Sequence, residues 1–106
     1  MPKYLFQAHY TVDGVKALLS KGGSARRAAA QSAVESVGGS LEAFYFAFGT
    51  TDGFAIVELP DNSAAASLAL TISGSGAVTV NTTVLLTPEE IDAATQAQVQ
   101  YTAPGQ

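Results

Sequence analysis

The fold is decided by residues 40–60, which read SLEAFYFAFGTTDGFAIVELP and contain four of the five phenylalanines in the chain. Two runs of aromatic and β-branched residues flank the turn-forming segment Gly49–Gly53, and this order is typical of an antiparallel hairpin. We expect its strands over about residues 41–48 and 52–59, with Pro60 ending the second. Because both faces of this hairpin carry apolar side chains, each face needs a cover.

Upstream of the hairpin, the pattern predicts one strand and two helical segments. Alternating apolar residues over 3–10 are typical of a strand. Thr11 is the expected N-cap of a short helix that Gly22-Gly23 interrupts. Ser24 is the expected N-cap of the second segment, which Gly38-Gly39 ends.

Downstream of the hairpin, the pattern predicts a helix, a strand and a terminal helix. The first helix begins at Asp61 or Ser63, and a strand rich in Val and Thr follows over 77–86. The segment Thr87-Pro88-Glu89-Glu90 is a strong helix start, with Thr as N-cap, Pro in the first turn and a capping-box Glu.

The resulting order, β-α-β-β-α-β plus a terminal helix, predicts a ferredoxin-like α+β fold with a four-stranded antiparallel sheet. Helices then cover only one face of the sheet. If the hairpin loop is Gly49–Thr51, small residues such as Gly53 and Ala55 face the helices. The other face then carries the large side chains of Phe44, Phe46, Phe48, Phe54 and Ile56. A second copy is the simplest cover for that face, so we expect a dimer around a central cavity.

The length and composition support this view. At 106 residues the chain makes one domain, expected over 1–95, with a polar C-terminal arm over 96–106. Charged residues make up 13% of the chain, about half the usual share, which favours a surface partly buried in a homodimer or higher homo-oligomer. The absence of cysteine excludes disulfides and thiolate chemistry, and a single histidine excludes multi-histidine metal sites. We therefore expect no metal and no cofactor.

The charges are unevenly placed. The net charge is −4, and all five basic residues lie within the first 27 positions. An acidic chain with so few cations is poorly suited to nucleic acid. The sequence has no signal-peptide pattern and no apolar stretch long enough to span a bilayer, so we expect a cytoplasmic protein without membrane contact.

Several segments together carry a family resemblance: MPKYLFQAHYT (1–11), GGSARRAA (22–29), LEAFYFAFG (41–49), VELPDN (57–62) and TTVLLTPEEI (82–91). In these segments the chain resembles GYD-domain proteins, small bacterial and archaeal proteins of the dimeric α/β-barrel superfamily. Where such proteins typically have Gly, an acidic or polar residue, Tyr and Asp, this chain has Gly49-Thr50-Thr51-Asp52, which lacks the Tyr but keeps the Asp. The resemblance implies the fold and leaves the activity open, because related barrels include cofactor-free monooxygenases, lactone isomerases, haem-handling enzymes and amino-acid-sensing domains.

His9 is the first candidate for chemistry. Antiparallel pairing brings it near Asp52 or Phe54 on one side and near Thr79 or Asn81 on the other. An Asp–His pair in an apolar cavity can serve as a general base. The alternative is a histidine that only bonds a strand neighbour at the interface. The expected apolar ligand would lie beside Gln7, Phe44, Phe46, Phe54, Ile56 and Asn81.

Two weaker candidates are charged clusters. Glu42 and Glu58 are expected roughly opposite one another, where two facing carboxylates would raise one pKa; the alternative is that they lie in water at the strand ends or pair with a cation of a partner. Four residues around the second helix start make a possible anion cradle: Lys21, Ser24, Arg26 and Arg27. The alternative for the two arginines is pairing with acids of another subunit.

Three functions stay open on these observations. The first is binding of an apolar or aromatic small molecule at a sheet-mediated dimer interface. The second is a cofactor-free monooxygenase or isomerase with His9 as general base. The third is a structural oligomer without ligand.

Overall fold

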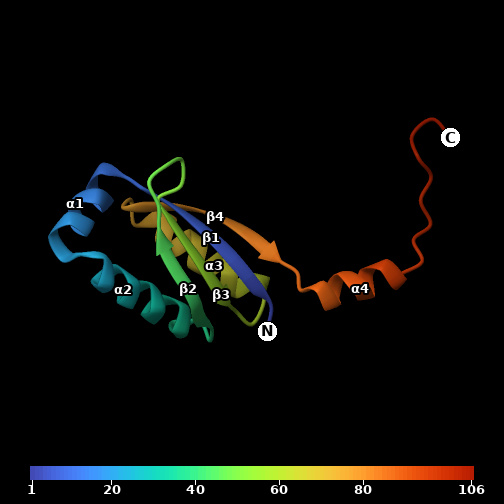
Figure 1. The fold of residues 1–106 in the computed structure, drawn as a ribbon, viewed down its shortest axis with the longest axis horizontal. Coiled ribbons are helices and arrows are strands. Elements are labelled where there is room, and N and C mark those ends of the chain that lie inside the picture. The colour runs from blue at the N-terminus through green and yellow to red at the C-terminus, as the bar shows by residue number, and fades with distance from the viewer.

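The computed structural model covers residues 1–106 and contains a single four-stranded antiparallel sheet with four helices. The elements in chain order are β1 (Lys3–Tyr10), α1 (Val12–Lys21), α2 (Gly23–Ser36), β2 (Ser40–Phe46), β3 (Gly53–Glu58), α3 (Asn62–Gly74), β4 (Val78–Leu85) and α4 (Pro88–Gln96). The spatial strand order is β2-β3-β1-β4 (Figure 1). This is the ferredoxin-like arrangement predicted from the sequence, with the terminal helix in addition.

Three of the four helices begin at the predicted caps. The side chain of Thr11 accepts a hydrogen bond from the amide of Gly14 at 3.3 Å, and that of Asp61 accepts one from Ala64 at 2.9 Å. Thr87 and Glu90 form the predicted capping box. Each of these bonds satisfies an amide that would otherwise lack a partner at the helix start.

The start of α2 differs from the prediction. Its N-cap is Gly22, with φ +85° and no side-chain cap, and the expected N-cap Ser24 lies inside the first turn. The chain bends from α1 into α2 at this single residue, and glycine adopts a backbone with positive φ without steric cost. A geometric requirement of the turn therefore overrides the capping preference of serine.

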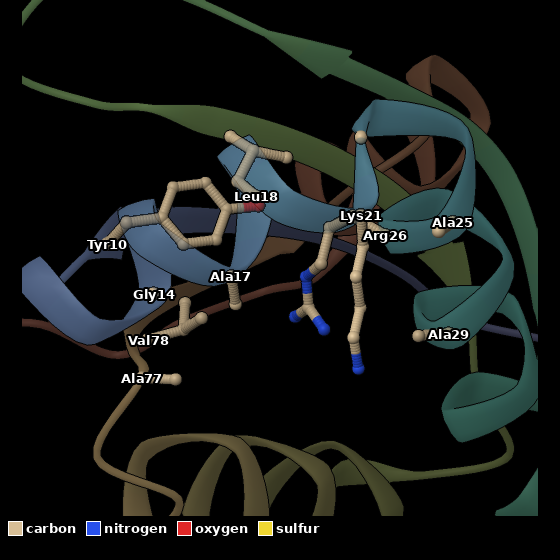
Figure 2. A pocket seen from close by; sticks show the side chains of 11 residues that line it. Tyr10, Gly14, Ala17, Leu18, Lys21, Ala25, Arg26, Ala29, Ala77 and Val78 are labelled. Atoms are coloured by element: carbon tan, nitrogen blue, oxygen red, sulfur yellow. The ribbon is translucent and has the colours of Figure 1, made fainter.

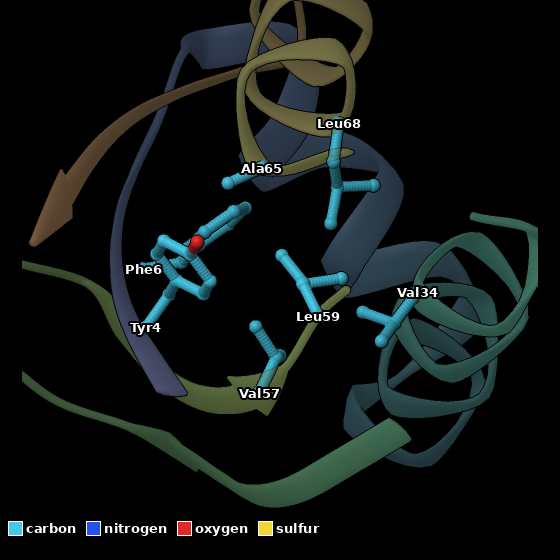
Figure 3. Packing of buried hydrophobic residues seen from close by; sticks show 7 residues of the cluster. All are labelled: Tyr4, Phe6, Val34, Val57, Leu59, Ala65 and Leu68. Atoms are coloured by element: carbon cyan, nitrogen blue, oxygen red, sulfur yellow. The ribbon is translucent and has the colours of Figure 1, made fainter. Parts of the chain in front are cut away.

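The hydrophobic core lies between the sheet and the helices (Figure 3). Helices α2 and α3 cover one face of the sheet, which we call the helix face. This face contributes Tyr4 and Phe6 from β1 and Val57 from β3, and Leu59, just after β3, belongs to the same cluster. The buried members are Tyr4, Phe6, Val34, Val57, Leu59, Ala65 and Leu68. Tyr4 donates a hydrogen bond to Oδ1 of Asn62 at 2.6 Å, so its hydroxyl has a polar partner at the border of the core.

The hairpin register is one residue away from the prediction. Phe46 pairs with Gly53 and the amide of Ala47 bonds the carbonyl of Asp52, so the loop has four residues, Phe48–Thr51, where three were expected. A β-bulge adds Glu42 further along β2. Because side chains alternate between the faces of a strand, the slip moves residues 43–46 to the opposite face, and the bulge returns the first residues of β2 to their expected faces.

The C-terminal part of the chain extends away from the sheet and its helices. Helix α4 has no buried residue, and the segment after it continues outward as an arm (Figure 1). The molecule measures 58 × 32 × 22 Å and has a radius of gyration of 16.9 Å, whereas a compact chain of this length would have about 13 Å. The projecting part therefore begins at α4, before the polar arm predicted from residue 96.

None of the helices combines the length and the hydrophobicity that crossing a bilayer would require.

Candidate functional site

The face of the sheet opposite the helices, which we call the open face, has an apolar centre with neutral polar neighbours. One row across the four strands consists of Tyr45, Phe54, Gln7 and Asn81. The adjacent row consists of Ala43, Ile56, Leu5 and Thr83. Tyr45 is 70% exposed, and Phe54, Ile56 and Leu5 are half-buried. Four of the predicted site residues therefore lie together on this face: Gln7, Phe54, Ile56 and Asn81.

Two predicted members of the apolar site do not lie on the open face. After the register slip, Phe44 and Phe46 point to the helix face, where their rings make an edge-to-face contact with centroids 5.2 Å apart. Phe46 also approaches Tyr10 at 6.4 Å. The prediction for Phe44 and Phe46 was therefore wrong, because a four-residue loop reverses the parity that assigned them. The phenylalanine at 48 is in the loop and fully exposed.

The sequence analysis missed Tyr45, which takes the place of the two phenylalanines on the open face. The sequence is compatible with this placement, because a hairpin loop of four residues in place of three puts Tyr45 beside Phe54. Nothing local in residues 47–52 distinguishes the two loop lengths.

His9 lies on the open face near the hairpin loop, opposite Thr79 of β4 as predicted. Its Nε2 atom is 3.5 Å from the hydroxyl of Thr51. The carboxylate of Asp52 has another partner, because its Oδ2 accepts a hydrogen bond from the backbone amide of Tyr10 at 2.9 Å. The structure therefore brings Thr51 to the imidazole and uses Asp52 to fix the end of β1.

The two glutamates predicted to face each other both contact Lys3. The ammonium donates to Glu42 and lies 3.3 Å from Oε1 of Glu58. The hydrogen bond with Glu42 is the main cause that raises the pKa of Lys3 above its ordinary value, and the contact with Glu58 acts in the same direction. Lys3, Glu42 and Glu58 thus form an ion-paired cluster within one chain, at one end of the open face.

A second candidate site lies on the other side of the molecule, between α1 and α2 (Figure 2). It is a cavity of about 190 Å³ whose lining includes Lys21 and Arg26. The other two residues of the predicted anion cradle, Ser24 and Arg27, are not part of this lining. Most of the remaining lining is small or apolar and comes from α1, α2 and the adjoining ends of β1 and β4.

No group of three or more His, Asp or Glu side chains gathers as it would around a metal ion.

Comparison with known proteins gives one match. The family model described as GYD domain matches residues 4–95. No curated protein and no solved structure matches the chain.

Proposed function

The chain belongs to the GYD domain family, and we propose that its open face pairs with the open face of a second copy and binds an apolar or aromatic small molecule between them. The observation that carries this proposal is the set of apolar side chains at the centre of the open face. Tyr45, Phe54, Ile56 and Leu5 occupy adjacent positions on three strands and no helix covers them. Apolar groups gathered in this way gain free energy when they leave water.

The chemistry of the open face favours a second copy as its cover. In a two-fold symmetric dimer, residues near the axis face their own copies in the partner. A charged residue at the centre of the interface would therefore face an identical charge and be repelled by it. The two central rows contain no charged residue. The ionic cluster of Lys3, Glu42 and Glu58 lies at one end and pairs within its own chain, which leaves the centre free for self-association.

The arrangement of polar groups supports a ligand between the two faces. The amides of Gln7 and Asn81 lie in the same row as Phe54. Ligand sites are typically apolar with a few polar groups that fix orientation. Aromatic and amide groups in one row suit a flat ligand with one or two hydrogen-bonding atoms.

Catalysis by His9, as a cofactor-free monooxygenase or an isomerase, is the weaker proposal. A histidine base is usually oriented by a partner that stabilises its charged form, and a carboxylate does this best. The carboxylate of Asp52 bonds the Tyr10 amide, and a hydroxyl lies near the imidazole. This environment suits a histidine that donates or accepts a hydrogen bond to a ligand better than one that abstracts a proton.

Native mass spectrometry of the full chain, purified from its own host, tests the proposal. We expect dimers that retain an additional small mass. Phe54→Ala removes an aromatic ring from the open face and should abolish retention, while Phe48→Ala removes an exposed loop ring and should not. Dimers without bound mass in all three proteins would contradict ligand binding and favour a structural oligomer. Monomers would contradict the proposal as a whole.

A further inference from the structure

We propose that the cavity between α1 and α2 binds a small organic anion, a carboxylate attached to an apolar body about the size of a benzene ring. The cavity lies on the helix side of the sheet, so this site is separate from the open face and does not depend on its pairing. The lining comes from four elements, which meet where α1 turns into α2 (Figure 2).

The volume and lining of the cavity suit the apolar body. About 190 Å³ is available, and an engineered apolar cavity of about 150 Å³ in another protein is known to bind benzene. Seven of the 11 lining residues are hydrophobic, among them Leu18 of α1 and Ala29 of α2. A ring placed here would contact alkyl groups on both helices and exclude water from them.

Two cations at the same cavity suit the carboxylate. Figure 2 shows the side chains of Lys21 and Arg26 extending into the space between the helices. Neither forms an ion pair, because the ion pairs of the chain are those of Lys3. The Nε atom of Arg26 is buried and has no hydrogen-bond partner. The guanidinium has no acidic partner within the chain, and an anionic oxygen on its accessible nitrogens would form a charge-assisted hydrogen bond.

The combination of these features selects the ligand class. A free phosphate would satisfy the cations but leave the apolar lining in contact with water. A neutral aromatic molecule would fill the space but leave Arg26 without a partner. Only a molecule with both parts meets both requirements, and benzoate is the simplest probe of this kind.

The test is a titration of the full chain with benzoate, followed by protein NMR, with benzyl alcohol as the neutral analogue. We expect saturable shifts of residues in α1 and α2 with benzoate and much weaker binding of benzyl alcohol. Lys21→Gln and Arg26→Gln each remove a charged hydrogen bond and should weaken benzoate binding by about tenfold or more. Arg27→Gln, at a neighbouring cation outside the lining, should change it less than about twofold.

A second pair of variants tests the cavity without altering charge. Ala29→Leu fills the space and should abolish binding, while Ala28→Leu, at an exposed position outside the lining, should preserve it. Lys21 is exposed, so its variant reports on binding even if Arg26→Gln does not fold.

Three results would overturn the proposal. One is benzoate binding that Lys21→Gln and Arg27→Gln weaken equally, which indicates diffuse attraction to the basic helices. Another is phosphate binding as tight as benzoate binding and unaffected by Ala29→Leu, which indicates an anion site without an apolar part. The last is an absence of benzoate saturation. A smaller oligomer in Arg26→Gln would then indicate that the cation pairs with an acid of a second copy.

Discussion

The hydroxyl of Thr51 lies 3.5 Å from Nε2 of His9, so the imidazole meets a neutral hydroxyl while the carboxylate of the next residue, Asp52, bonds the amide of Tyr10 at 2.9 Å. This relationship separates the two residues that a general-base mechanism would need as a pair. It also assigns Asp52 a structural role at the end of β1, next to the hairpin loop.

Asp52→Ala should therefore lower the free energy of unfolding by about 1–2 kcal/mol, because the amide of Tyr10 loses a charged acceptor. The measurement is urea unfolding of the wild type and the variant. Asp13→Ala, at an exposed acid in the first turn of α1, is the control and should have a smaller effect. An unfolding free energy unchanged by Asp52→Ala would contradict the structural role.

Helix α1 packs closely at Gly14 against the backbone of Ala77, the residue before β4. A Cβ at Gly14 would overlap the carbonyl oxygen of Ala77, the same carbonyl that accepts a hydrogen bond from the amide of Thr11 at 3.0 Å. Gly14→Ala should destabilise the fold by about 1–3 kcal/mol, since helix and strand must move apart. Gly74→Ala, where a Cβ meets nothing within 4 Å, is the matched control and should be neutral or slightly stabilising. Equal thermal unfolding of both variants would show that α1 does not pack this tightly.

The ionic cluster of Lys3 predicts a specific alkaline dependence. The hydrogen bond with Glu42 raises the folded-state pKa of Lys3, so the stabilisation is complete at lower pH and is lost as the pH rises above about 10.4, the pKa in the unfolded chain. The difference in Tm between the wild type and Lys3→Met should be constant to about pH 9 and change above about pH 10.4. Lys16 forms no ion pair, so the difference in Tm between the wild type and Lys16→Met should show no such change. A Lys3→Met difference that stays constant through this range would contradict the cluster.

Helix α4 and the arm that follows contribute no buried residue to the fold. A chain that ends at Thr87 should therefore unfold with a free energy within about 0.5 kcal/mol of the wild type under the same conditions. Urea unfolding measures this directly. A loss of several kcal/mol would show that α4 packs against the body of the protein or against a second copy.

Local signals in the sequence predict most of the fold. Thr11, Asp61 and the Thr87–Glu90 capping box each satisfy helix amides through their own side chains, so the helix starts can be recognised without knowledge of the rest of the chain. The strand bounds of β1 follow from its alternation for the same reason. The placement of His9 opposite Thr79 is a consequence of the predicted topology and was correct.

The errors arise where several residues act together. Phe48 looks like a strand residue by its chemistry, yet the four-residue loop leaves it fully exposed. The bulge at Glu42 confines the slip to residues 43–46, and neither the loop length nor the bulge has a distinctive local sequence. A shift of one residue then exchanged Phe44 and Phe46 for Tyr45 on the open face. The cavity at Lys21 and Arg26 depends on the angle between α1 and α2, which Gly22 sets through its backbone and which no side-chain pattern encodes.

The central claim, that a second copy covers the open face, is tested most directly by sedimentation of Ile56→Glu at micromolar concentration. The new carboxylate lies at the centre of the open face, between Ala43 and Leu5, where pairing would bury it without a partner. Leu70→Glu places the same charge on the exposed side of α3, where the leucine is 74% exposed, and serves as the control. We predict dimers for the wild type and Leu70→Glu and folded monomers for Ile56→Glu; an Ile56→Glu protein that sediments as the same dimer would contradict the claim.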